Sequence, residues 1–131
     1  MCGGIEYQSE KVYFPNPQAR LPLRLRSGDV TWVTWGNRKQ EANKDFPNGG
    51  WGRLNSIYAG KWKPWRPRPV LIAANQFMEK DQNEQSHWIP LDNRMVIQGL
   101  LAERKNERRV YALSQQDRKS TRLNSSHLVI S

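Results

Sequence analysis

The chain has 131 residues, about the length of one domain and enough to bury a sizeable hydrophobic core. No apolar run reaches the roughly 18 residues of a membrane-spanning helix, and the opening MCGGIEYQSE lacks a secretory signal pattern, which argues against membrane and secreted proteins and predicts a cytoplasmic location. The single cysteine excludes an internal disulfide framework and a zinc site built on several thiolates. A net charge of +9 favours a polyanionic partner, nucleic acid first, although solvated surface charge is the alternative.

In chain order, the residue pattern predicts short strands separated by turns. Residues 20–26 alternate basic and apolar side chains, and the turn at 27–29 predicts a hairpin into residues 30–35. A polar loop is expected at 36–50 and a strand entering a helical turn at 51–58, while three prolines prevent a regular helix at 61–69. Further strands are expected at 11–14, 70–74, 76–80, 86–91, 95–102 and 108–114, the last three completing a meander. This pattern predicts an antiparallel β or α+β domain.

Residues 117–131 differ from the rest of the chain. They show neither helical nor strand periodicity, and residues 117–127 back-translate codon by codon onto a DNA sequencing adapter. We interpret 117–131 as a non-native translated adapter that packs against nothing or only as an appended segment; a native basic tail is the alternative. The natural gene is then expected to continue beyond Gln116, so that residues 1–116 are the N-terminal part of a longer domain. They keep 18 Lys and Arg against 11 Asp and Glu, a net charge of +7.

Cys2 directly follows the initiator methionine. Removal of Met1 would leave a thiol and an α-amine on one residue, and the amine, with a pKa of roughly 7.7–8.0, is partly neutral at pH 7. Such an amine attacks an aldehyde to give a Schiff base, which the neighbouring thiolate closes to a five-membered thiazolidine. The alternative is an ordinary cysteine at a frayed terminus.

Two further titratable residues are candidates for acid–base chemistry. Glu79 follows an apolar strand and could act as a general acid or base toward an imine, or it could be a surface glutamate. His87 is expected to be a strand residue and not a catalyst. The sequence contains no histidine pair for a metal, no P-loop and no dinucleotide-binding motif, so we expect neither metal nor cofactor.

The stretch GKWKPWRPRP alternates cations with indoles. Its cations can contact phosphates while Trp62 and Trp65 stack on exposed bases, or these tryptophans can pack the core. The cations of this predicted DNA-binding surface are Lys61, Lys63, Arg66 and Arg68.

Several segments together resemble the N-terminal half of the SRAP family, the SOS-response-associated peptidases that crosslink to abasic sites in DNA. The opening MCG matches the start of that family, and residues 33–36 resemble its strand ending in Trp-Gly. Residues 52–57 resemble its A-R-x-E-[ST]-I segment, and residues 61–65 its K-P-x-W region. Residues 68–80, RPVLIAANQFMEK, resemble its R-C-L-I-P-A-x-G-[FY]-x-E-W strand pair, and 96–101 and 110–114 resemble the strands that follow.

The resemblance implies an α+β, mostly antiparallel, barrel-like domain and a role for individual residues. Cys2 would be the nucleophile toward the ring-opened sugar aldehyde, and Glu79 would assist Schiff-base and ring chemistry. Arg53 would contact phosphate, Trp35 would belong to the wall that holds the DNA open, and Asn16 would lie near the cysteine. The implied partner is single-stranded DNA with abasic sites, bound by a monomer.

The chain departs from the family pattern at several positions. Gly4 replaces an arginine, Trp51 an asparagine and Lys80 a tryptophan, and the H-x-R-M-P motif with the family's catalytic histidine is absent. We do not transfer that role to His87. Two other functions stay open: a non-covalent single-stranded DNA-binding module with an inert Cys2, and a cysteine-dependent peptidase whose main cleavage removes Met1.

Overall fold

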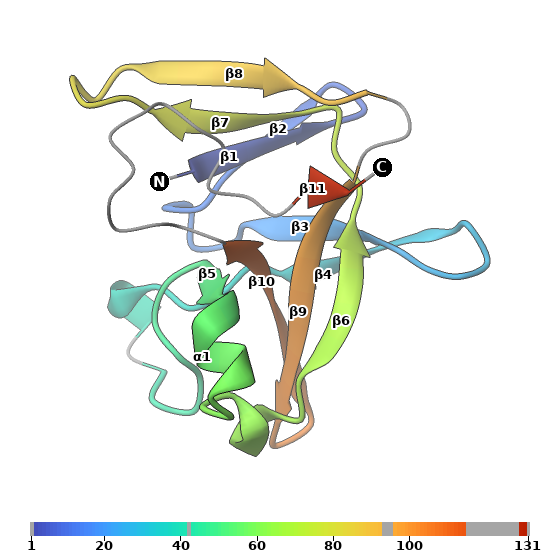
Figure 1. Cartoon of the computed structure of the whole chain (residues 1–131), viewed down its shortest axis with the longest axis vertical. Helices are drawn as coiled ribbons and strands as arrows, with labels where there is room; N and C mark the ends of the chain where they lie inside the picture. The colour runs from blue at the N-terminus through green and yellow to red at the C-terminus, as the bar shows by residue number, and fades with distance from the viewer. Residues whose placement is uncertain (1, 42, 93–95, 115–128, 131) are drawn as a thin grey trace.

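Two β-sheets, sheet A and sheet B, pack against each other in the computed structural model, which describes residues 2–41, 43–92, 96–114 and 129–130 (Figure 1). Sheet A is antiparallel and has the order β2-β1-β7-β8. Its strands are β1 (Cys2–Tyr7), β2 (Glu10–Tyr13), β7 (Gln76–Lys80) and β8 (Ser86–Pro90).

Sheet B has the order β4-β3-β6-β9-β10-β5, with β11 paired to β9. Its neighbours are antiparallel except β5, which runs parallel to β10. Its strands are β3 (Arg20–Arg24), β4 (Val30–Thr34), β5 (Trp51–Arg53), β6 (Arg68–Ile72), β9 (Val96–Arg104), β10 (Glu107–Ser114) and β11 (Val129–Ile130). The helical elements are η1 (Lys39–Glu41), α1 (Leu54–Tyr58) and η2 (Lys63–Trp65). None of the described helices is long and apolar enough to cross a membrane.

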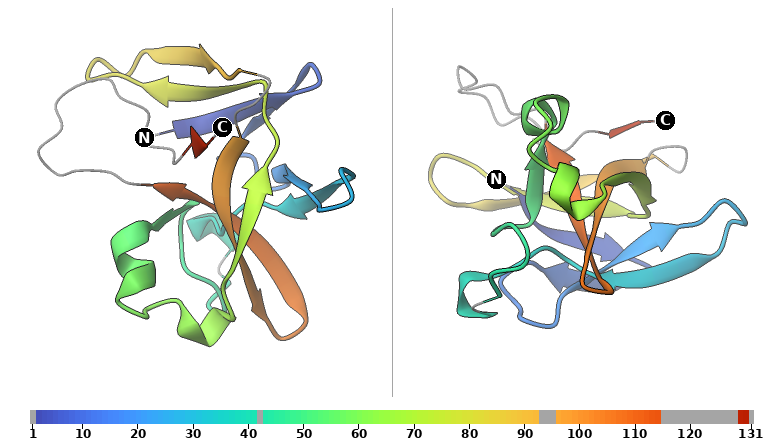
Figure 2. Two further views of the ribbon diagram at one scale, coloured as in Figure 1. Left: turned by 45° about the vertical axis from the view of Figure 1, so that its right-hand side comes forward. Right: turned by 90° about the horizontal axis from the view of Figure 1, so that it is seen from below.

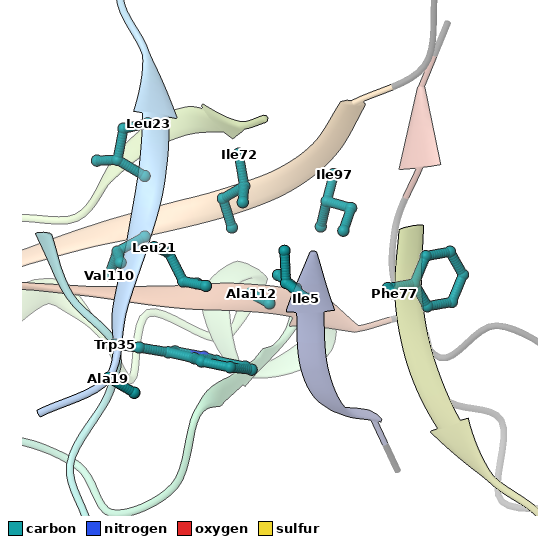
Figure 3. Packing of buried hydrophobic residues seen from close by; sticks show 10 residues of the cluster. All are labelled: Ile5, Ala19, Leu21, Leu23, Trp35, Ile72, Phe77, Ile97, Val110 and Ala112. Carbon is teal, nitrogen blue, oxygen red and sulfur yellow. The ribbon is translucent and has the colours of Figure 1, made fainter. Parts of the chain in front are cut away.

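The main hydrophobic core fills the space between the two sheets. Ile5 of β1 and Phe77 of β7 enter it from sheet A, and the other side chains come mostly from sheet B, as Figure 3 shows. Because side chains alternate along a strand, β10 directs Val110 and Ala112 into this core and Tyr111 and Leu113 to the opposite face. The buried members of this main core are Ile5, Ala19, Leu21, Leu23, Trp35, Ile72, Phe77, Ile97, Val110 and Ala112.

A second cluster lies on the other face of β9 and β10. Tyr111 and Leu113 of β10 pack there against Trp62, and Ile57 of α1 and Trp65 of η2 border the cluster. The short segment of α1 and η2 therefore covers this face of sheet B (Figure 1).

Most of the strands that the sequence predicts are present. The hairpin of β3 and β4 is confirmed, as are β2, β6, β7, β8, β9 and β10 within one or two residues at most boundaries. The strand entering a helical turn is confirmed by β5 and α1. Residues 61–69 contain no regular helix, only the 3-10 turn η2 and the start of β6 at Arg68. The mostly antiparallel β architecture with a small helical part is therefore confirmed.

Two expectations need correction. Strand β1 was not expected, although it occupies the middle of sheet A. The expected meander is divided, because β8 pairs with β7 in sheet A whereas β9 and β10 pair in sheet B. Neither sheet is closed into a barrel within the described residues.

The tail is described only at Val129 and Ile130, which pair with Ile97 and Val96 at the start of β9. This part of the tail is therefore in contact with sheet B. Residues 115–128 and 131 lie outside the described residues.

A buried ionic network holds the loop at 36–50 against sheet B. Glu41 accepts hydrogen bonds from Arg38 Nη1 and Arg109 Nη1, both at 2.8 Å, and Arg109 Nη1 also donates to the Gly36 carbonyl. Arg38 and Arg109 are 3% and 7% exposed. Gly36 has φ +58, and a Cβ there would lie 2.2 Å from the Gly49 carbonyl oxygen, so only glycine fits this turn.

Replacing Glu41 with Gln should lower the free energy of unfolding by about 3 kcal/mol, because it leaves two buried guanidinium groups without their shared carboxylate. Urea denaturation at pH 7 measures this loss. The matched control is Glu107→Gln, since Glu107 also pairs with Arg109 but its side chain is 46% exposed, and it should cost less than about 1 kcal/mol. Equal losses in the two variants would contradict the bridging role of Glu41.

The stabilisation by Glu41 should also depend on pH. Burial raises the pKa of Glu41, but hydrogen bonds from Arg109 and Arg38 lower it more, so the folded pKa lies below the ordinary value of 4.5. A lowered folded pKa gives stability that is present above the unfolded pKa and is lost as the pH falls through the folded pKa. The difference in unfolding free energy between wild type and Glu41→Gln should therefore shrink as the pH is lowered below about 4.5. A difference that stays constant down to about pH 3 would contradict this assignment.

Candidate active site and nucleic-acid surface

The start of β1 lies directly opposite the end of β7. Cys2 is the cross-strand partner of Glu79, and Glu79 is in turn the partner of His87 on β8. The register shifts between Cys2 and Gly4, which is the position of a β-bulge. Three residue types capable of nucleophilic or proton-transfer chemistry therefore occupy one row across sheet A.

The side chain of Glu79 is buried. It is 2% exposed and lies two residues after Phe77, so both side chains are on the face of β7 that is turned toward sheet B. A carboxyl group fixed on an internal strand can give or take a proton without reorganising. The alternative interpretation of Glu79 as a surface glutamate is therefore wrong.

His87 lies in β8, as expected for a strand residue, but the structure places it beside Glu79. Its Nε2 is 2.8 Å from Asp81 Oδ2, and Asp81 Oδ1 accepts the backbone N–H groups of Asn83 and Gln85. The hydrogen bond with His87, followed by that from Gln85, holds the pKa of Asp81 below its usual value. His87 was not predicted as a neighbour of Glu79. The signal that indicates it is the hairpin register of residues 76–80 and 86–90.

Arg53 lies at the same end of the molecule as Cys2. It is exposed at the end of β5, where its register partner is Ser114 at the end of β10. All three views place the start of β1 close to the ends of β5 and β10 (Figures 1 and 2). The turn that contains Asn16 is also near, because the Phe14 N–H donates to the Gly3 carbonyl at 2.9 Å. Asn16 itself is exposed, and its Oδ1 accepts the Gln18 N–H.

The structure does not bring Arg68 to this site. Arg68 pairs with Leu101, which pairs with Val110, four residues before Ser114. Four residues along β10 and three strand spacings separate Arg68 from Arg53 by about 20 Å. Arg68 is instead close to Glu103, with 3.6 Å between Nη2 and Oε1. The exposed Lys61, Lys63 and Arg66 lie between these positions in sequence, after α1.

The tryptophans of the basic stretch belong to the second cluster. Trp62 is 7% exposed, and its ring centroid lies 4.8 Å from that of Tyr111. Trp65 is half-buried, and its Nε1 donates to the Asp45 carbonyl at 2.6 Å. Of the two alternatives for these indoles, the structure supports packing: Trp62 is a buried member of the second cluster and Trp65 packs against it.

Trp35 is also a core residue. It is 0% exposed, its Nε1 donates to the Gly50 carbonyl at 3.0 Å, and its ring makes edge contacts with Phe14 and Trp51. A side chain without exposed surface has no area to offer to DNA. The expected place of Trp35 in a wall against DNA is therefore corrected to a place in the core.

The described residues contain no group of three or more His, Cys, Asp or Glu side chains that could hold a metal ion. Comparison of the chain with models of protein families, with curated proteins and with solved structures finds no match.

Replacing Trp35 with Phe should lower the free energy of unfolding by about 1–3 kcal/mol, since it removes a buried hydrogen bond and leaves a cavity. Any affinity of the folded protein for single-stranded DNA should not change. Urea denaturation and fluorescence anisotropy with a labelled oligonucleotide measure the two quantities. A large loss of affinity for single-stranded DNA, with an unchanged free energy of unfolding, would indicate that Trp35 contacts DNA.

Proposed function

We propose that this chain is SRAP-like and forms a covalent bond with abasic sites in single-stranded DNA through Cys2. The observation that carries the proposal is the register that sets the buried Glu79 opposite Cys2. The barrel-like closure that the family resemblance implies is part of the same proposal.

The first step is attack of the Cys2 amine on the aldehyde of the ring-opened abasic sugar. It requires removal of Met1, because an amide nitrogen is not nucleophilic. The resulting carbinolamine loses water to give an imine, and Glu79 donates the proton that leaves with the hydroxyl group. One water is released, and no oxidant or reductant is needed.

The second step is addition of the Cys2 thiolate to the imine carbon. A new C–S bond forms, the imine nitrogen takes a proton, and the product is a five-membered thiazolidine. This ring closes within one residue, so its formation costs no loop entropy. The ring explains why a cysteine at this position would give a more stable adduct than an amine alone.

Arg53 supports the proposal as a phosphate contact at the same end of the molecule as Cys2, and Asn16 as a polar neighbour of the start of β1. Phosphate contacts position a strand without reading its sequence. We therefore propose a strand that is held by its backbone while the abasic sugar reaches Cys2.

A non-covalent single-stranded DNA-binding module is the second candidate function. It is favoured by the segment from Trp51 to Met78, which carries five basic and no acidic residues. In that function Cys2 and Glu79 would have no chemical role.

Variants of the full chain test the covalent proposal on a denaturing gel with an oligonucleotide that contains one abasic site. Wild type should give a heat-stable crosslink, and a preparation that keeps Met1 should give none. Cys2→Ser keeps the amine but not the thiol, so it should leave only an imine that borohydride traps. An equal yield of heat-stable crosslink from Cys2→Ser without reductant would exclude Cys2 as the nucleophile.

Glu79→Gln should slow crosslinking about 100-fold, because a carboxamide keeps the shape but cannot transfer a proton. The matched control is Glu6→Gln, which changes a half-buried carboxylate of the same sheet and should leave the rate unchanged. Initial rates on the same gel measure both variants. A wild-type rate for Glu79→Gln would remove its proposed role in proton transfer.

A further inference from the structure

Tyr58 is an exposed aromatic residue that packing does not explain. It is the last residue of α1, and 79% of its surface is exposed, more than that of the other exposed large hydrophobic residues described. The preceding residue, Ile57, packs against the second cluster. The helix is therefore anchored through Ile57 while the ring of Tyr58 is left in solvent.

The charged residues that flank Tyr58 in the sequence, from Arg53 to Arg66, are all basic. Among the described residues, Arg53, Lys61, Lys63 and Arg66 form no ion pair, whereas Arg68 lies near Glu103 and Lys105 pairs with Asp45. Arg53 immediately precedes α1, a helix of five residues and about 7.5 Å. A polyanion that approaches α1 therefore meets positive charge on both sides of the exposed ring.

Backbone hydrogen bonds hold the lysines close to the end of α1. The Lys61 N–H donates to the Ser56 carbonyl at 3.1 Å, and the Gly60 N–H donates to the Ile57 carbonyl at 3.0 Å. Gly60 has φ +78, which turns the chain back, and the Lys63 N–H donates to the Gly60 carbonyl. These bonds fix the turn that carries Lys61 and Lys63 beside Tyr58.

We infer that α1 and this turn form a stacking site for single-stranded nucleic acid. Tyr58 stacks on one unpaired base, Arg53 binds the phosphate on the side of Cys2, and Lys61 and Lys63 bind phosphates on the other side. Stacking on an aromatic ring requires an open base face, which a single strand offers and a duplex covers. The inference deepens the proposed function, since it extends the path of the bound strand from Cys2 over Arg53 to α1.

Equilibrium binding of the full chain to an intact oligothymidine tests the site separately from the covalent chemistry. Tyr58→Ala should weaken binding about 10-fold, which corresponds to about 1.4 kcal/mol and lies in the range for one stacked base. Tyr58→Phe should bind like wild type, because the phenyl ring still stacks. Fluorescence anisotropy at low salt gives the dissociation constants, and oligouridine in place of oligothymidine shows whether RNA binds equally. The stacking site would be overturned if Tyr58→Ala bound oligothymidine with wild-type affinity, or if Tyr58→Ala and Tyr58→Phe weakened binding equally. It would also be overturned if Tyr58→Ala weakened the binding of a duplex as much as that of a single strand.

The lysines have their own control. Lys61→Gln and Lys63→Gln should each reduce the slope of log affinity against log salt by about 0.7, as expected for one lost phosphate contact. Lys105→Gln, which changes a lysine already paired with Asp45, should leave the slope unchanged. Equal slope changes in all three variants would contradict a localised site.

The two proposals fail separately. Intact oligothymidine carries no aldehyde, so the dependence of its binding on Tyr58 is measured whether or not the wild type crosslinks to the abasic oligonucleotide. A Tyr58→Ala variant that binds normally but does not crosslink would count against the stacking site. If the wild type formed no heat-stable crosslink but its binding to oligothymidine still depended on Tyr58, only the covalent function would be overturned.

Discussion

The antiparallel pairing of β1 with β7 is the constraint on which the arrangement of sheet A and its candidate site depend. Ile5 and Phe77 are register partners, are 0% and 1% exposed, and both enter the core between the sheets. A slip by one residue would turn one of them toward solvent, so the buried pair specifies the register. The shift between Gly4 and Cys2 then sets Cys2, in place of Gly3, opposite Glu79, so the placement of the candidate nucleophile depends on both the buried pair and the β-bulge.

The aromatic and basic residues of the chain have separate tasks. In the segment KWKPW the 3-10 turn directs Trp62 and Trp65 into the second cluster and leaves Lys61 and Lys63 in solvent. The tryptophans thus belong to the cluster against which α1 packs, and the neighbouring lysines remain exposed to solvent. Tyr58, which no sequence pattern singled out, is the aromatic ring that this support leaves exposed.

Local elements could be predicted from the sequence, whereas their assembly could not. Alternation and turn residues suffice for the β3–β4 hairpin, because strand and turn lie within 15 residues. Strand β1 was missed because Gly3 and Gly4 give no alternating pattern, and only its partners in sheet A make it a strand. Contacts between distant segments could not be predicted in this way. They determine the division into two sheets, the burial of Trp35 and the network of Arg38, Glu41 and Arg109. Cys2 and Glu79 could be proposed from residue chemistry and resemblance, but the position of His87 needed the register.

The mass of the peptide that carries Cys2 tests the central claim most directly. After reaction of the full chain with abasic DNA, digestion and mass spectrometry should give an adduct at Cys2 equal to peptide plus nucleotide remnant minus one water, with no free thiol and no need for reduction. That mass with a blocked thiol distinguishes the thiazolidine from an open imine, which leaves the thiol reactive toward an alkylating reagent. An adduct on a lysine, or at Cys2 with an alkylatable thiol, would contradict the account.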